Sequence, residues 1–145
     1  YGVEIDDANL LNCFANGINV IQYDLEAGLS SFESDSFDYV ILSQTLQAMR
    51  NTEGIIQEML RVGKQGIVSF PNFGYWRNRV QVIAGHMPMS KTLPYHWYDT
   101  PNIHLEALCH QSGARILERR VMNNNHPVKF LPNLMGLLAF YRFER

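Results

Sequence analysis

Two acidic residues, Glu4 and Asp24, each stand at the end of a short apolar run, where they could bind a nucleoside. The runs, 1–5 and 18–23, have the length and composition of β-strands. In open α/β sheets, ligands collect at the carboxyl ends of the strands, where a carboxylate can accept hydrogen bonds from both hydroxyls of a ribose. We expect Glu4 to hold a ribose and Asp24 to accept a hydrogen bond from an adenine amino group, with Leu25 packed on the ring.

Each acid also has a simpler, structural interpretation. Acidic residues after strands often cap the next helix or face water, and either residue alone favours that role. The two together, on neighbouring predicted strands, favour a ligand. Ser43 and Gln44 follow a third predicted strand and are expected at the same edge. The candidate cofactor-binding residues are therefore Glu4, Ile5, Asp24, Leu25, Ser43 and Gln44.

Short β-rich runs alternate with helical stretches along the chain, which predicts a single α/β domain with a mostly parallel sheet. Strands are predicted over 1–5, 18–23, 37–43, 66–70, 114–122 and 137–145. Helices are predicted over 8–16, from Asn51 or Thr52 to Gly63, within 73–85 and over 106–112. The run 37–43 is apolar enough for a strand buried on both faces, and Gly17 and Gly63 are expected to end helices.

Composition narrows the functional classes. The chain has 145 residues, 46% of them hydrophobic, and a net charge of −2, so it has the core of a folded domain and no cluster of Lys and Arg that would indicate nucleic acid binding. Its longest apolar runs are too short to span a bilayer.

Cys13 and Cys109 lie on predicted apolar helix faces, which favours buried, inert thiols in a reducing, cytoplasmic compartment. The five histidines lack metal-ligand spacing.

The order of these elements resembles the class I S-adenosylmethionine-dependent methyltransferases, from their second strand to their antiparallel last strand. More narrowly, the chain resembles the MetW family of methionine biosynthesis. The stretches that carry the resemblance are 1–5, 38–47, 69–73 and 97–104. It implies a Rossmann-like, doubly wound, mostly parallel sheet with an antiparallel C-terminal strand, and S-adenosylmethionine or S-adenosylhomocysteine bound at the candidate residues.

The sequence departs from this pattern in two places. The glycine-rich loop that follows the first strand of the superfamily is absent, so we expect the natural protein to extend N-terminally by at least a strand and a glycine-rich turn. Residues 1–145 would then be one N-terminally incomplete methyltransferase-like domain. Between Leu105 and Glu106 the sequence is also several residues shorter than MetW-like chains.

Three functions fit these observations. The first is methyl transfer to a small-molecule acceptor, with Tyr95–Tyr98 and His104 as a lid or acceptor pocket and His96 or His104 as a base. These aromatic residues could equally be packing or partner-facing groups, and no catalytic residue is assigned. The second, implied by the resemblance, is a largely non-catalytic partner or activator of homoserine O-acyltransferase, with 73–76 and 95–98 as an interface. The third, a nicotinamide-dependent dehydrogenase, explains Glu4 alone and ranks last.

Overall fold

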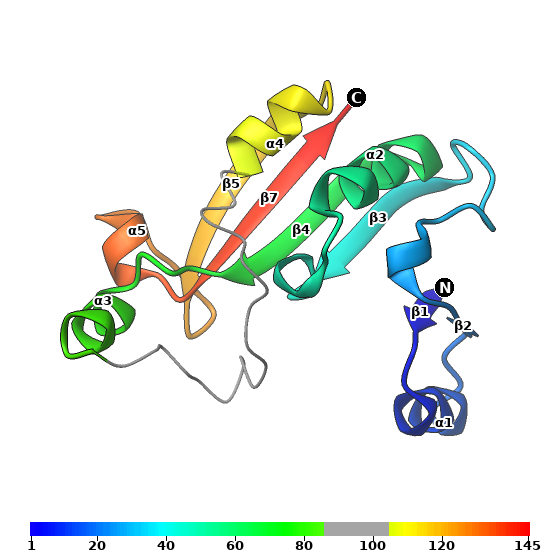
Figure 1. Ribbon diagram of the computed structural model, residues 1–145, viewed down its shortest axis with the longest axis horizontal. Coiled ribbons are helices and arrows are strands. Elements are labelled where there is room, and N and C mark those ends of the chain that lie inside the picture. Colours follow the sequence, from blue (N-terminus) through cyan, green and yellow to red (C-terminus); the bar gives the residue numbers. More distant parts are fainter. Residues whose placement is uncertain (86–104) are drawn as a thin grey trace.

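The computed structural model describes residues 1–85 and 105–145, in which strands and helices alternate along the chain (Figure 1). The strands are β1 (Gly2–Glu4), β2 (Val20–Gln22), β3 (Phe37–Ser43), β4 (Gly63–Pro71), β5 (Arg115–Asn123), β6 (His126–Pro127) and β7 (Leu138–Glu144). The helices are α1 (Asp7–Ala15), α2 (Thr52–Val62), α3 (Trp76–Ile83), α4 (Leu105–Gln111) and α5 (Pro132–Met135), with single 3-10 turns η1 (Leu25–Ala27) and η2 (Leu46–Ala48).

The strands form two sheets. Five of them make a sheet of order β3-β4-β7-β5-β6, while β1 and β2 pair as a separate parallel ribbon. β3 and β4 are parallel, and β7 runs antiparallel to both of its neighbours, β4 and β5. Three strands of the larger sheet therefore share one direction and the last long strand opposes them, as the sequence analysis predicted. The ribbon and α1 lie beside β3, apart from the larger sheet (Figure 1).

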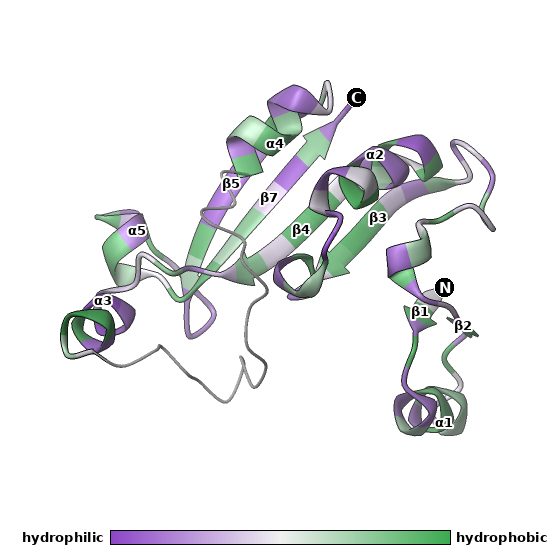
Figure 2. Ribbon diagram, viewed as in Figure 1, coloured by the Kyte–Doolittle hydropathy of each residue, from purple (hydrophilic) through white to green (hydrophobic). Residues whose placement is uncertain are grey.

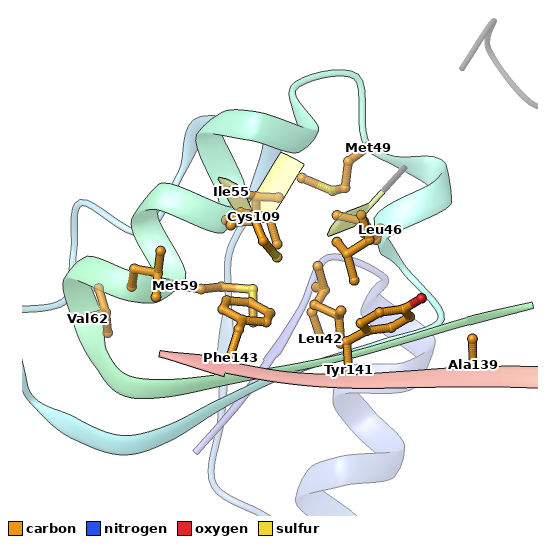
Figure 3. Close-up of a cluster of buried hydrophobic side chains, with 14 of the residues drawn as sticks. Leu42, Leu46, Met49, Ile55, Met59, Val62, Cys109, Ala139, Tyr141 and Phe143 are labelled. Carbon is orange, nitrogen blue, oxygen red and sulfur yellow. The ribbon is translucent and has the colours of Figure 1, made fainter. Parts of the chain in front are cut away.

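The hydrophobic core lies between one face of the larger sheet and the helices α2 and α4 (Figure 3). Side chains along β7 alternate between buried and half-buried positions, the pattern of a strand with unequal faces. Figure 2 shows that β7 carries both hydrophobic and hydrophilic residues along its length. Phe143 of β7 is completely buried below α2. A Cβ atom on Gly66 of β4 would lie only 2.4 Å from that ring, so a residue without a side chain is needed there.

The second face of β3 contradicts one expectation. Its Tyr39 and Ile41 side chains are 54% and 66% exposed, whereas Leu42 is buried on the face that α2 covers. The prediction of a strand buried on both faces is therefore wrong within the described ranges. The cause is that α2 covers only the face of β3 that carries Leu42. β3 also pairs only with β4, so its other edge faces the ribbon.

Helix ends mostly follow the sequence signals. The side chains of Asp6 and Asn51 cap α1 and α2 by accepting a hydrogen bond from the backbone N–H three residues on, at 3.0 and 2.9 Å. Gly17 adopts φ +70° just after α1, as predicted. Gly63 does not: it is extended, with φ −121°, and begins β4 directly. Glycine is needed there for space, since a Cβ atom would lie 2.6 Å from the Val40 side chain.

Of the remaining helices, two were predicted from the sequence and one was not. α3 and α4 form where helices were predicted, and both Leu105 and Glu106 belong to the first turn of α4. The short helix α5 was not predicted. Cys109 on α4 is buried, as predicted, and burial raises the pKa of its thiol to about 11, which disfavours the reactive thiolate. Cys13 is only half-buried, so its expected burial is wrong. In the part of the chain that is described, no helix is long and apolar enough to cross a membrane.

Candidate functional site

A cleft of about 360 Å³ separates β1 from β3, where the ribbon faces the larger sheet. Residues 1–3 form one wall, residues of β3 form the other, and Leu29 and Met59 are among the core side chains that line its depth. The rings of Tyr1 and Phe37 meet edge to face across it, with centroids 6.3 Å apart. The starts of β1 and β3 therefore lie next to each other, although the two strands share no ladder of hydrogen bonds.

Both strand edges that face the cleft carry unpaired backbone groups. The Gly2 N–H donates to the Asn19 carbonyl at 2.8 Å, so the backbone of Val3 points away from β2. The Gln44 N–H donates to the Ser69 carbonyl at 2.8 Å, which shows that alternate residues of β3 face β4. By the same alternation, the backbone groups of 39, 41 and 43 face the cleft.

Glu4 ends β1, and its carboxylate organises the turn that follows. Oε1 accepts hydrogen bonds from the backbone N–H groups of Ile5 and Asp6 at 2.9 and 3.0 Å, and Oε2 accepts one from the Asn9 side chain at 3.3 Å. A carboxylate offers about four acceptor positions, so Oε2 keeps one for a ligand. Glu4 can therefore hold the turn after β1 and still accept a hydrogen bond from a ribose.

Asp24 lies two residues past the end of β2, the strand that pairs with β1. Its Oδ1 accepts a hydrogen bond from the Glu26 N–H at 2.9 Å and caps η1, which leaves Oδ2 free to accept another. Register pairs Glu4 with Gln22, so both acids leave the same, carboxyl end of two adjacent parallel strands. Leu25 is half-buried and lines the cleft beside them.

The carboxyl end of β3 holds a small polar cluster. Gln44 adopts φ +51°, the left-handed conformation that is rare for residues with side chains and recurs at functional sites. The hydroxyls of Ser43 and Ser69 are 3.3 Å apart, and the Gln47 side-chain amide donates to the Gln44 carbonyl at 2.5 Å. Sequence reasoning missed Ser69 and Gln47, although both fall in stretches that carried the family resemblance.

Of the six candidate residues, the structure places two, Leu25 and Ser43, in the lining of the cleft. Glu4, Asp24 and Gln44 lie at strand ends near its rim, and Ile5 is 61% exposed. Their roles in cofactor binding stay predictions. The proposed lid, 95–98 with His104, lies outside the described residues. In 1–85 and 105–145, no group of three His, Cys, Asp or Glu side chains is placed to hold a metal ion.

An ion pair on α2 fixes the loop that follows the candidate adenine contact. Glu58 accepts hydrogen bonds from Arg61 at 2.7 and 2.8 Å and from the Leu29 backbone N–H at 3.0 Å. Arg61 in turn donates to the carbonyls of Leu29 and Phe32, both at 2.9 Å. The Arg61 guanidinium holds the pKa of the Glu58 carboxyl below its usual value. The loop between η1 and β3 is thus anchored to α2, with Leu29 buried beneath the cleft.

Solved structures with the same architecture define the class of this fold. A possible histamine N-methyltransferase of Thermotoga maritima matches with a TM-score of 0.69 and 16% identity, over 99% of this chain and 71% of that one. An S-adenosylmethionine-dependent methyltransferase of Archaeoglobus fulgidus matches with a TM-score of 0.70 and 14% identity, over 99% and 75%. Magnesium protoporphyrin IX methyltransferase of Synechocystis, solved with bound S-adenosylhomocysteine, matches with a TM-score of 0.59 and 15% identity, over 100% and 63%. The chain has the fold of class I methyltransferases.

Sequence comparison narrows the class to one family. The family model "Methionine biosynthesis protein MetW" matches residues 1–143, and the chain belongs to this family. A relative in Rhodopirellula baltica, "Bifunctional methionine biosynthesis protein MetXA/MetW", is 47% identical over 103 residues, which are 70% of this chain. The matched region spans only 16% of that longer protein.

We predict that Glu58→Gln destabilises the protein by roughly 1 to 2 kcal/mol at pH 7, because it weakens hydrogen bonds to a charged group that is partly exposed. The folded-state pKa of Glu58 is lowered, so its contribution is complete above the ordinary value of 4.5 and is lost as the pH falls through the folded value. Urea unfolding at pH 7 and pH 3 measures this. A destabilisation that is equal at both pH values contradicts the ion-pair explanation. Glu53→Gln, an exposed change on the same helix, is the control.

Proposed function

We propose that this protein binds S-adenosylmethionine through its adenosine half at the carboxyl ends of β1 and β2. The observation that carries the proposal is the placement of Glu4 and Asp24 at the same end of adjacent parallel strands, each with an acceptor oxygen still available. A ribose diol on Glu4 and an adenine amino group on Asp24 would use those oxygens. Membership of the MetW family and the methyltransferase fold support the same cofactor.

The activity we propose is methyl transfer to a small molecule of methionine biosynthesis. S-adenosylmethionine supplies an electrophilic methyl group, so the protein has chiefly to orient two ligands and exclude water. Gln44 and its neighbours suit an orienting role, because the polar cluster of Ser43, Gln47 and Ser69 holds the end of β3 in one conformation. A strong base is not required for such a displacement, and the described residues offer no obvious one.

We expect Glu4→Gln in the full-length natural protein to weaken S-adenosylhomocysteine binding by roughly 1.5 to 3 kcal/mol, the usual range for a hydrogen bond to a charged group. Glutamine keeps the oxygen that accepts from the backbone of Ile5 and Asp6, so the turn should survive. Asp7→Asn, the same charge change three residues on, is the matched control. Isothermal titration calorimetry measures both variants.

An unchanged affinity in Glu4→Gln would place this residue in a purely structural role. The same calorimeter also tests the dehydrogenase alternative. Tight binding of NAD without binding of S-adenosylhomocysteine would replace the methyltransferase proposal, since Glu4 could then contact the ribose of a dinucleotide.

We also propose that a further parallel strand, contributed by residues that precede Tyr1 in the natural protein, occupies the cleft between β1 and β3. The unpaired backbone groups of Val3 on one side and of 39 and 41 on the other support this, since sheet edges are otherwise paired, covered or charged. The exposed apolar side chains of Tyr39 and Ile41 add to it. Such a strand would join the ribbon and the larger sheet into one and would precede the expected glycine-rich turn.

Hydrogen exchange tests the inserted strand residue by residue. In the natural protein, we expect the amides of Tyr39 and Ile41 to exchange as slowly as those of Val40 and Leu42, which face β4. In a protein limited to residues 1–145, Tyr39 and Ile41 should exchange much faster while Val40 and Leu42 stay protected, because only the outward amides lose a partner. Fast exchange of Tyr39 and Ile41 in the natural protein would contradict the proposal.

A second role is favoured by one specific observation. The Rhodopirellula baltica relative combines MetXA and MetW in one chain, and such a fusion brings two proteins permanently together. We propose that this protein works in contact with the homoserine O-acyltransferase that the family resemblance implies, as its partner or activator. The two roles are compatible, since cofactor binding could be the signal that the partner responds to.

Co-purification with the acyltransferase from the same organism tests the second role. We expect a stable complex and a changed rate of homoserine acylation when this protein is added. Methylation of homoserine or its acylated forms, followed with labelled S-adenosylmethionine, separates the roles: transfer supports the enzyme, and a complex without transfer supports the activator. If no complex forms and the rate of acylation does not change, the partnership is excluded.

A further inference from the structure

Charge is distributed very unevenly along this chain, although its net value is only −2. Residues 1–62 contain ten acidic and two basic residues, whereas residues 63–145 contain ten basic and four acidic ones. The imbalance is greatest in two segments, 72–85 and 119–137, which we call the basic end. They contain no acidic residue and five basic ones, namely Arg77, Arg79, Arg119, Arg120 and Lys129.

The two segments of the basic end are bound to each other by Asn72. Its side-chain amide donates to the carbonyls of Asn133 and Gly136 at 3.0 and 2.9 Å, while its oxygen accepts from the Gly74 N–H at 3.1 Å. Gly74 packs so closely that a Cβ atom would lie 2.6 Å from the Asn133 carbonyl oxygen. α3 and α5 therefore form one end of the molecule, beyond the carboxyl end of β4 (Figure 1).

Large apolar side chains are exposed at the same end. Phe130 and Leu131 are 78% and 52% exposed, and Ile83 of α3 is 85% exposed. The Arg77 guanidinium lies over the ring of Trp76, 5.4 Å from its centroid. Exposed aromatic residues interleaved with arginine are the composition of protein interfaces. The helix predicted within 73–85 thus forms as α3, but its apolar residues Trp76, Val80 and Ile83 are exposed.

Two of the five cations at this end are paired with carboxylates, Arg119 with Glu106 and Arg120 with Glu118. Within residues 1–85 and 105–145, no carboxylate forms an ion pair with Arg77, Arg79 or Lys129. A hollow of about 500 Å³ is lined by Arg119, Arg120 and Lys129 among others. The neighbouring edge strand β6 has two residues and ends in Pro127, so this edge is poorly suited to adding another strand. A ligand would instead meet side chains.

We propose that the basic end is the surface that docks the acyltransferase, through a patch of that enzyme in which carboxylates surround an apolar pocket. The inference rests on the partnership proposed above and adds where the contact lies. Charge complementarity selects an acidic partner, and Phe130 and Leu131 supply the apolar anchors that usually dominate binding energy. The fusion of MetXA and MetW in the relative favours a protein partner over a nucleic acid or an anionic membrane, and the test below separates these ligands.

The test compares two double variants of the full-length protein for binding to the purified acyltransferase. Lys129→Glu with Phe130→Ala should raise the dissociation constant at least about tenfold, and the remaining binding should depend less on salt. Lys64→Glu with Phe14→Ala makes the same residue changes at exposed positions outside the basic end. It also breaks the exposed ion pair of Lys64 with Asp38, but it should leave the dissociation constant within about twofold. Calorimetric binding of S-adenosylhomocysteine verifies that both variants are folded.

Each outcome decides between the proposals. If the wild-type protein binds the acyltransferase and both variants bind equally well, the basic end is not the interface, while the partnership stands. If the wild-type protein does not bind, the partnership fails and this inference fails with it. Binding of RNA or of phosphatidylglycerol vesicles at physiological salt, lost in Lys129→Glu with Phe130→Ala but not in the control, would assign the surface to those ligands and overturn the inference.

Discussion

Backbone pairing between parallel strands is the constraint on which this structure depends. A strand that pairs on one side presents a row of N–H and C=O groups on the other, and those groups need partners. β4 satisfies the rule, since it lies between β3 and β7. β1 and β3 do not, and the cleft and the separation of the ribbon follow from their unpaired edges. Glu4 and Ser43 lie at the ends of these same strands, and Asp24 follows β2, the partner of β1, so the shape of the candidate cofactor site depends on how the strands pair.

Local sequence signals predicted most elements but not how they meet. β3 has the predicted bounds, Phe37–Ser43, and the caps of α1 and α2 were found, because the alternation of side chains and the capping residues act over a few positions. The short helix α5 was missed, since it is held by Asn72, some sixty residues away in the chain. The exposed second face of β3 was also missed, because burial depends on what covers a strand.

Some residues of the candidate site were predicted from the sequence and others were not. The strand ends revealed Glu4 and Asp24, and the structure adds that both acids also cap the turns that follow them. The structural and the proposed ligand-binding interpretations, which seemed to be alternatives, are compatible, because each carboxylate keeps an acceptor position after its local hydrogen bonds. Ser69 could not be found by its position after a strand, because it lies within β4 and contributes through its pairing with β3.

The position of β7 determines when the molecule can assemble. This strand follows all the others in the described chain, yet it lies between β4 and β5 and contributes Phe143 to the middle of the core. β4 and β5 cannot be bridged before β7 has been synthesised, so the larger sheet cannot close until then. Until β7 is in place, the apolar face of α2 lacks part of its cover, which leaves hydrophobic surface open to aggregation.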